Sequence, residues 1–361
     1  EQLEKLPVLP RRELAELQGH DAILEDRRNL LGQPLPESHA ASFALLVYAS
    51  SWIKRYHPAV FACALLNSQP MGFYAPAQIV CDAIEHGVPV RPVDVNHSHY
   101  DCTLEDDVPA EPAAAWVGSG KSTWGVGGPA LRLGLRRVKG LREAHARRIV
   151  ERRQVGPYTS IEHFHRASGL PASVVTRLAE ADAFGSLSCA RRPAAWQALA
   201  ITDQQLPLFE EPLIESAIDL PPMPLGQEVL ADYPASGFSL KAHPISLVRQ
   251  ELTRRRVITA AALRSIKRGW VRVAGLVLIR QRPGTARGIV FMTLEDETGV
   301  VNLIVTPEVF DPHRPAARHA SLLLAEGHLQ RQGEVLHVHA KRLYDLSGYL
   351  QYFAMPSRDF C

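Results

Sequence analysis

The spacing of apolar residues changes from a helical to a strand-like period along this chain. Between residues 34 and 105, apolar residues recur every three or four positions in the stretches FALLVYASSWI, PAVFACALLNS and PAQIVCDAIEHG. This period predicts amphipathic helices, and Gly87 at the end of the third stretch is typical of a helix C-terminus. The next stretch, VPVRPVDVN, is short and broken by proline, which indicates a strand or a turn. From residue 268 onward the apolar runs partly alternate, which predicts strands.

Five such runs lie between residues 268 and 346, and a short helical stretch, PEVFDPHRPAARHA, separates the third from the fourth. Five strands with a helix at this point is the order of an OB-fold, whose open face commonly binds single-stranded nucleic acid. The candidates for a single-strand groove are four arginines and one stacking aromatic residue: Arg272, Arg280, Arg282, Arg287 and Phe291. Trp270 and Tyr344 are the other aromatic candidates, and packing in the core is an equally good interpretation for each aromatic residue.

The net charge of +2 hides two strongly basic regions. Residues 254–287 contain ten Lys or Arg and no acidic residue, and residues 131–153 contain nine basic residues against two glutamates. One basic run alone is most often a solvated face. Two such regions on differently patterned segments favour a polyanionic partner.

The first basic region has the form of a helix-hairpin-helix motif, LRLGLRRVKGLREAHARRIVERR. Gly140 permits a tight turn, which leaves backbone amides at a helix N-terminus available for a DNA phosphate. The candidates for DNA-backbone contacts are Lys139, Gly140, Arg142, Arg147 and Arg148. An ordinary helical hairpin is the alternative, and the excess of basic residues favours DNA. A second, less basic hairpin is indicated by SIEHFHRASGLPASVVTRLAEADAFGSL.

Several other classes of site are not supported by the sequence. The five cysteines show no CxxC spacing, which argues against a zinc site and a disulfide framework, so we expect a cytoplasmic protein with no bound metal or cofactor. No window approaches the length of a membrane span, and the start does not resemble a signal peptide. The GSGKST stretch has Ala115 where a phosphate loop needs glycine, so a loop is the better interpretation.

Four stretches together resemble the bacterial error-prone DNA polymerases of the C family, the ImuC type related to the alpha subunit of DNA polymerase III. They are PESHAASFALLVYASSWIKRYHPAVFACALLNSQPMGFY, RPVDVN, ALRLGLRRVKGL and RQRPGTARGIVFMTLEDETGVVNLIV. The resemblance runs from about Pro36 to the C-terminus. It implies the C-terminal part of a DNA-directed DNA polymerase that acts in error-prone translesion synthesis after DNA damage.

The expected fold is multidomain α+β, with an all-α fingers segment and a tandem helix-hairpin-helix before a C-terminal five-stranded OB-fold β-barrel. The expected boundaries are an unassigned helical lead-in (1–33), the end of the fingers (34–105), a loop or hairpin (106–130), the helix-hairpin-helix region (131–200), a linker (201–226), a helical connector (227–267), the OB-fold (268–346) and a tail (347–361).

The resemblance also implies functional residues, and it shows which catalytic residues of the family this sequence lacks. The fingers of the family bring Ser38 and His39 near the incoming nucleotide, although Glu37 stands where replicative relatives have lysine. The polymerase needs Mg²⁺ held by palm carboxylates, and no such set is found in this sequence. The acidic stretch at residues 295–297 fits hairpin residues better. We therefore expect no catalytic residue here and no polymerase activity from this chain alone.

A short apolar segment in the linker, residues 205–209, has the Gln-Leu-x-Leu-Phe form of bacterial sliding-clamp ligands. Leu208 and Phe209 would fill an apolar pocket, Gln205 would bind at its rim beside Leu206, and Pro207 would lower the entropy of the free segment. The expected partners are therefore duplex and single-stranded DNA, the sliding clamp and other proteins of the translesion mutasome. An apolar latch onto the hairpin region is the alternative interpretation of this segment.

Two other functions fit parts of the pattern. The chain could be a non-enzymatic helix-hairpin-helix and OB-fold adaptor in DNA repair. Recognition of tRNA beside a synthetase is weaker, because the sequence shows no adenylate-forming motif. The fingers-like stretch favours the polymerase over both.

Overall fold

The computed structural model describes residues 39–72, 74–106, 123–201, 220–332, 335–350 and 358–360. The chain divides into two compact units, Glu1–His57 and Pro58–Cys361. The described part of the first unit is helix α2 (His39–Tyr56), in agreement with the predicted helical period. Lys54 and Arg55 occupy its last turn, where positive charge interacts favourably with the helix dipole.

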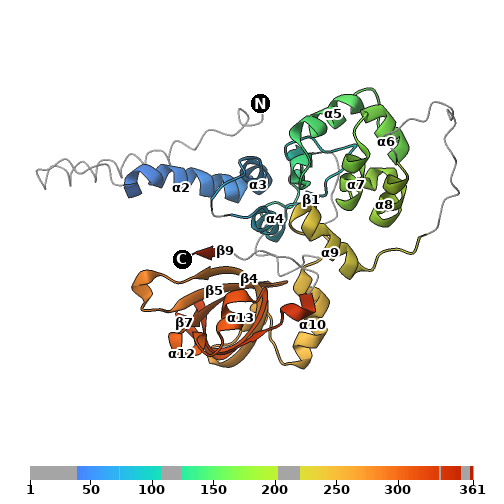
Figure 1. Ribbon diagram of the computed structural model, residues 1–361. Coiled ribbons are helices and arrows are strands. Elements are labelled where there is room, and N and C mark those ends of the chain that lie inside the picture. The colour runs from blue at the N-terminus through green and yellow to red at the C-terminus, as the bar shows by residue number, and fades with distance from the viewer. Residues whose placement is uncertain are drawn as a thin grey trace, which may run out of the picture. The chain divides into compact units, whose positions relative to one another are not determined.

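The second unit begins with two helices and a small sheet (Figure 1). The helices are α3 (Pro58–Asn67) and α4 (Pro76–Glu85), and Gly87 follows α4 with a φ of +82°. Strands β1 (Val90–Arg91), β2 (Thr103–Glu105) and β3 (Ala130–Arg132) form the sheet in the order β1-β3-β2. The strand or turn predicted for VPVRPVDVN contains β1, but the all-α description of residues 34–105 is wrong at its end, because β1 and β2 both pair with β3, which lies further along the chain than local periodicity can reveal.

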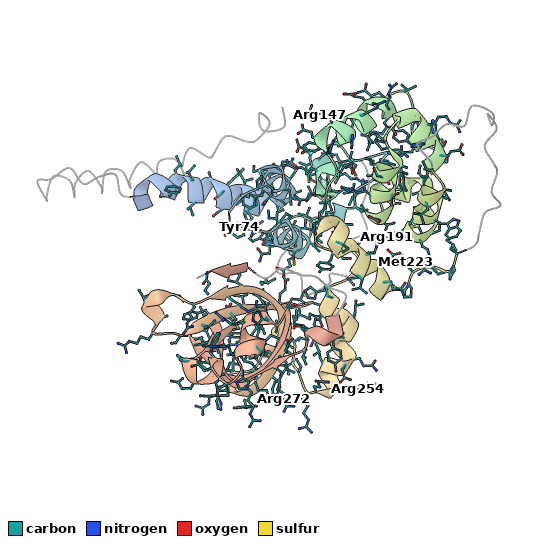
Figure 2. All side chains as sticks on the ribbon, in the orientation of Figure 1. Tyr74, Arg147, Arg191, Met223, Arg254 and Arg272 are labelled. Carbon is teal, nitrogen blue, oxygen red and sulfur yellow. The ribbon has the colours of Figure 1, made fainter. Side chains whose placement is uncertain are left out.

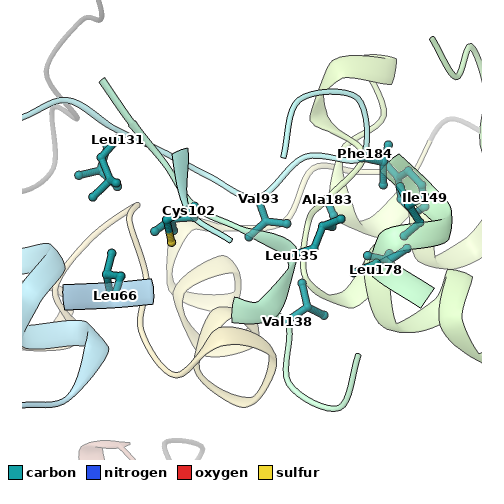
Figure 3. Close-up of a cluster of buried hydrophobic side chains, with 14 of the residues drawn as sticks. Leu66, Val93, Cys102, Leu131, Leu135, Val138, Ile149, Leu178, Ala183 and Phe184 are labelled. Atoms are coloured by element: carbon teal, nitrogen blue, oxygen red, sulfur yellow. The ribbon is translucent and has the colours of Figure 1, made fainter. Parts of the chain in front are cut away.

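The region after the sheet contains the predicted helical hairpins. Its elements are η3 (Leu135–Arg137), α5 (Glu143–Arg153), α6 (Ile161–Ser168), α7 (Ala172–Glu180), η4 (Gly185–Leu187) and α8 (Arg191–Ala200). One apolar core runs from the small sheet into these helices, as Figure 3 shows from Leu66 and Leu131 across to Phe184. Phe164 packs edge-on against Phe184 with ring centroids 5.3 Å apart.

The RPVDVN stretch joins the small sheet to the helices through Asp94, whose side chain is buried. The Asp94 carboxylate accepts hydrogen bonds from the backbone N–H groups of Asn96 and Ser186, both at 2.8 Å. The Asn96 amide in turn donates to the carbonyl of Tyr158 at 2.9 Å. A buried carboxylate is stable only when it is hydrogen-bonded, so this stretch fixes the sheet against the end of the hairpin region.

The connector contains α9 (Leu225–Ser236), α10 (Pro244–Arg254) and α11 (Ala260–Leu263). The sequence predicted one helical stretch that ends at Arg254. The structure has two helices there, α9 and α10, and α10 ends at Arg254 as predicted. Gly237 adopts a φ of +94° after α9, and Pro244 opens α10 at a position where its missing N–H is not needed. The break separates α9 from α10.

The C-terminal barrel has the predicted order of five strands, with the helices after the third. Its elements are β4 (Gly269–Gln281), η5 (Gly284–Ala286), β5 (Val290–Asp296), β6 (Gly299–Val305), α12 (Pro307–Phe310), α13 (Arg314–His319), β7 (Leu322–Gln332) and β8 (Val335–Asp345), followed by η6 (Ser347–Leu350) and β9 (Arg358–Phe360). β9 pairs with the end of β4, so part of the expected tail is a strand. The strands are ordered β5-β6-β8-β7-β4, and β5 also pairs with β4, which closes the barrel.

Gly275 lies where β4 changes its partner from β7 to β5. A Cβ atom there would lie 2.6 Å from the carbonyl oxygen of Glu295, so only glycine allows this close approach of two backbones. Along β5 the alternation of buried Val290, Met292 and Leu294 with outward-facing residues matches the expected strand period.

Candidate nucleic-acid interface

The first hairpin, residues 135–153, turns at Gly140 with a φ of +75°. Val138 before the turn and Ile149 on α5 are buried, so the turn is anchored on both sides by apolar contacts. Arg142 is the N-cap of α5 and does not cap the helix with its side chain. No hydrogen bond to the backbone N–H groups of Glu143 and Ala144 is found in the part of the chain that the structure describes. These amides are therefore available to an anion at a helix N-terminus.

The basic residues of this hairpin have different surroundings. Arg142 is exposed and forms no ion pair with any described residue. Arg147, labelled in Figure 2, is exposed and lies 2.6 Å from the Glu143 carboxylate, whose hydrogen bond and charge raise the pKa of its guanidinium. Among the described residues, the Arg142 guanidinium has neither an ion pair nor a hydrogen-bond partner.

Lys139 points toward the connector. Its ammonium group donates a hydrogen bond to the carbonyl of Tyr233 at 2.8 Å, and its backbone N–H donates to the carbonyl of Ala235. Loss of hydration lowers the pKa of Lys139, and the nearby Arg137 lowers it further. The C-terminal end of α9 is a favourable place for a cation, so the geometry gives this side chain a structural partner.

Arg148 lies against one hairpin turn, and Arg177, which was not among the predicted site residues, lies against the other. The Nε of Arg148 donates to the carbonyl of Ser168 at 2.6 Å, and Nη1 of Arg177 lies 3.5 Å from the carbonyl of Lys139. The sequence held a signal for Arg177, because Gly-Leu is followed by arginine at the same spacing in both hairpins.

The barrel separates the predicted single-strand residues into three groups. Arg280 is buried, with 7% of its surface exposed, and its guanidinium donates to the carbonyls of Ala317 and Ala320 at the end of α13. The prediction that Arg280 lines an open groove is wrong, because a charge inside the barrel needs these carbonyl partners. Sequence alone did not show that this position of β4 faces inward.

The β4–β5 loop carries the exposed Arg282 and Arg287, and Phe291 lies just after it on β5, opposite Gln281 of β4. The ring of Phe310 lies 5.4 Å from the guanidinium carbon of Arg282. Phe291 is half-buried and alternates with the core residues of β5, so it faces out of the barrel. Its role as a stacking residue stays a prediction.

A surface pocket of about 320 Å³ lies at the start of β4. It is lined by Arg256, Ile258, Ile266, Trp270, Val271 and Arg272. Trp270 is 51% exposed and packs edge-on against His328 with ring centroids 5.0 Å apart. The Glu326 carboxylate lies 2.6 Å from Arg272 and offsets its charge, whereas Arg256 is exposed and has no ion pair among the described residues.

The acidic stretch at residues 295–297 is part of the β5–β6 hairpin, as expected. Asp296 accepts hydrogen bonds from the backbone N–H groups of Ala260 and Thr298, and Arg249 pairs with both Asp296 and Glu297. Within the described residues, no group of three or more His, Cys, Asp or Glu side chains is placed to hold a metal ion. None of the described helices combines the length and apolar character needed to cross a membrane.

Two sets of predicted residues lie outside the described residues. The first is Ser38 of the fingers, whose neighbour His39 is described only as the first residue of α2. The second is the segment 205–209, with Gln205, Leu206, Leu208 and Phe209. The linker and fingers interpretations therefore stay predictions.

Paired helical hairpins and a closed five-stranded barrel define a nucleic-acid-binding protein. Residues 87–194 match the model of a helix-hairpin-helix motif, and residues 271–346 match the model of an OB-fold nucleic acid binding domain. The predicted fold types, a helix-hairpin-helix region followed by an OB-fold, are confirmed.

Comparison with known proteins confirms the resemblance to the error-prone DNA polymerases. The chain is 49% identical to error-prone DNA polymerase 1 of Agrobacterium fabrum over 86% of its own length and 29% of the relative. It is 48% identical to error-prone DNA polymerase 2 of Rhizobium meliloti, with 88% and 29% covered, and to the error-prone DNA polymerase of Methylococcus capsulatus, with 90% and 31% covered. The chain thus spans less than a third of the length of these curated relatives.

The buried Arg280 generates a prediction about stability. Replacement of Arg280 with Met removes the donors for two carbonyls at the end of α13, and each unsatisfied buried group costs about 1–3 kcal/mol. We expect the melting temperature of the barrel to fall markedly in differential scanning calorimetry. The matched control is Arg282→Met, which changes an exposed arginine on the adjoining loop and should leave the melting temperature nearly unchanged. Equal effects of the two substitutions would contradict the structural role of Arg280.

Proposed function

We propose that this chain is the DNA-binding portion of an error-prone DNA polymerase that acts in translesion synthesis. The helix-hairpin-helix region would hold the duplex backbone, and the barrel would hold the single-stranded template. The observation that carries the proposal is the Gly140 turn, where the first backbone N–H groups of α5 and the Arg142 guanidinium lie together without partners among the described residues. Contacts of this kind bind phosphate without reading sequence, as a polymerase that moves along DNA requires.

The relatives are named error-prone DNA polymerases, so template-directed nucleotidyl transfer with Mg²⁺ is the activity we propose for the whole polypeptide. The described residues would contribute to that reaction by holding its substrate. Two basic surfaces on separate folds suit this task, because the product duplex and the unpaired template differ in shape and flexibility.

The Trp270 pocket supports single-strand binding by the barrel. It combines an exposed aromatic ring, apolar lining residues and the guanidinium of Arg256, which has no ion pair within the described part of the chain. A nucleobase can stack on the ring while its phosphate binds the arginine, and neither contact depends on the identity of the base. Phe291 and the β4–β5 loop arginines offer a second place for the strand.

We also propose that residues 205–209 bind the sliding clamp. Support comes from the Gln-Leu-x-Leu-Phe form and from the position between α8, which ends at Ala200, and α9. A tether to the clamp raises the effective concentration of the polymerase at a primer end without additional DNA contacts.

Replacement of Arg142 with Gln tests the duplex-binding proposal. If Arg142 neutralises one phosphate, the slope of log affinity against log salt concentration should fall in magnitude by about 1 for duplexes of unrelated sequence. The measurement is a fluorescence anisotropy titration at several salt concentrations. Arg166→Gln is the control, because Arg166 is an exposed arginine of α6 whose charge is already paired with Glu162. An unchanged slope for Arg142→Gln would show that Arg142 does not contact a phosphate.

Replacement of Trp270 with Ala tests the single-strand site. Loss of a base stacked on the ring should lower affinity for single-stranded DNA by about 1–3 kcal/mol, with duplex affinity unchanged. Tyr344→Ala is the control, because Tyr344 is also an exposed aromatic residue of the barrel but does not line the pocket. If both substitutions have the same small effect, no base stacks on Trp270.

Simultaneous replacement of Leu208 and Phe209 with Ala tests the clamp proposal. Apolar anchors dominate peptide interfaces of this kind, so clamp binding should be lost in surface plasmon resonance while the affinity for DNA and the melting temperature stay the same. Glu210→Ala with Glu211→Ala is the control, because it changes the same segment without an anchor. A substantial fall in the melting temperature of the Leu208 and Phe209 variant would identify an intramolecular latch instead.

A further inference from the structure

The two hairpins repeat one short pattern. Residues 138–149, VKGLREAHARRI, and residues 167–178, ASGLPASVVTRL, both contain Gly-Leu and an arginine eight positions after the glycine. The equivalent pairs are Gly140 with Gly169 and Arg148 with Arg177. Both glycines adopt positive φ, +75° and +58°, which side chains other than that of glycine rarely allow.

Each of these arginines contacts the turn of the other hairpin. Arg148 of the first hairpin donates to the carbonyl of Ser168 at 2.6 Å, and Arg177 of the second lies with Nη1 at 3.5 Å from the carbonyl of Lys139. Ser168 and Lys139 hold the same place, immediately before the glycine. The contacts are therefore reciprocal, as if related by a two-fold axis.

The guanidinium groups also cover the glycines themselves. A Cβ atom on Gly169 would lie 2.8 Å from Nη2 of Arg148, and one on Gly140 would lie 1.9 Å from Nη1 of Arg177. Glycine thus provides both the positive φ and the space for a planar guanidinium from the other hairpin. A flat group with fixed donor directions restrains position and rotation together, which an ammonium on a flexible stem does not.

From these reciprocal contacts we infer that Arg148 and Arg177 are positioning residues that couple the two DNA-binding turns. Each arginine fixes the turn of the opposite hairpin, so that both turns meet the backbone of the duplex as one unit. Arg148 then acts through Ser168 and not through a phosphate, which changes the role expected from the sequence. The inference rests on the proposed binding of duplex DNA by the hairpins, but the coupling itself is a property of the free protein.

Hydrogen exchange of the DNA-free protein tests the coupling. Arg148→Gln should speed amide exchange about three- to tenfold at Gly169 and Leu170, the equivalent of one lost hydrogen bond, and leave Leu141 unchanged. Arg177→Gln should speed amide exchange at Lys139 and Leu141 and leave Gly169 and Leu170 unchanged. Arg166→Gln, on the exposed face of α6, should affect neither turn. Faster exchange only in the hairpin that carries the substitution, or no change, would overturn the inference.

Duplex binding by the same full-length variants separates positioning from a phosphate contact. Positioning predicts that Arg148→Gln and Arg148→Lys weaken binding several-fold and equally, with the salt slope unchanged, because lysine keeps the charge but not the planar fork. It also predicts that the Arg148 and Arg177 double variant is little worse than either single variant, since both changes uncouple the same pair.

A slope that falls by about 1 in Arg148→Gln and is restored in Arg148→Lys would assign Arg148 to a phosphate and overturn the inference. If the unaltered chain does not bind duplex DNA, the proposed function fails, and the exchange measurement still decides the coupling. If Arg148→Gln does not fold, Arg148→Lys serves for both measurements.

Discussion

A buried cluster of charges fixes the hairpin region to the connector, and much of the second unit depends on it. The guanidinium of Arg191 on α8 is only 4% exposed and pairs with Asp232 and with Glu228 of α9, the latter at 2.9 Å (Figure 2 labels Arg191). Lys241 pairs with Asp182 at 2.7 Å and also with Glu228. Removal of one partner would leave an uncompensated charge in a largely buried site, so the cluster stabilises this arrangement of α8 and α9.

The connector helices that the cluster holds also contact the Gly140 turn and the barrel. The last turns of α9 hold Lys139 through the Tyr233 carbonyl, so the position of the Gly140 turn depends on the connector. On the other side, Ile245 and Leu252 of α10 share a core with Leu276 and Leu322 of the barrel. The connector is therefore a packed element of the second unit, and the break at Gly237 lets its two helices meet different neighbours.

The sequence predicted those features that depend on local periodicity and on glycine. Three features could be predicted because each follows from neighbouring residues. They are the change of period at residue 268, the helices after the third strand and the turn at Gly140. The burial of Arg280 and the anchoring role of Asp94 could not be predicted, because each depends on partners far away in the chain, and the repeated spacing that marks Arg177 does not reveal its contact with Lys139. The residues proposed to bind DNA were chosen by charge, and charge alone did not show which cations already have partners.

The change of partner at Gly275 constrains the order in which the barrel forms during synthesis. The second half of β4 finds β5 as soon as the next strand leaves the ribosome, but its first half must wait for residues 322–329. β5, β6, α12 and α13 are all made in between. Pairing over such a separation is slow, and an unpaired strand edge that stays open is prone to aggregation. Nascent chains should consequently be most vulnerable between the emergence of β4 and that of β7, and translation speed in that interval should influence the yield of folded protein.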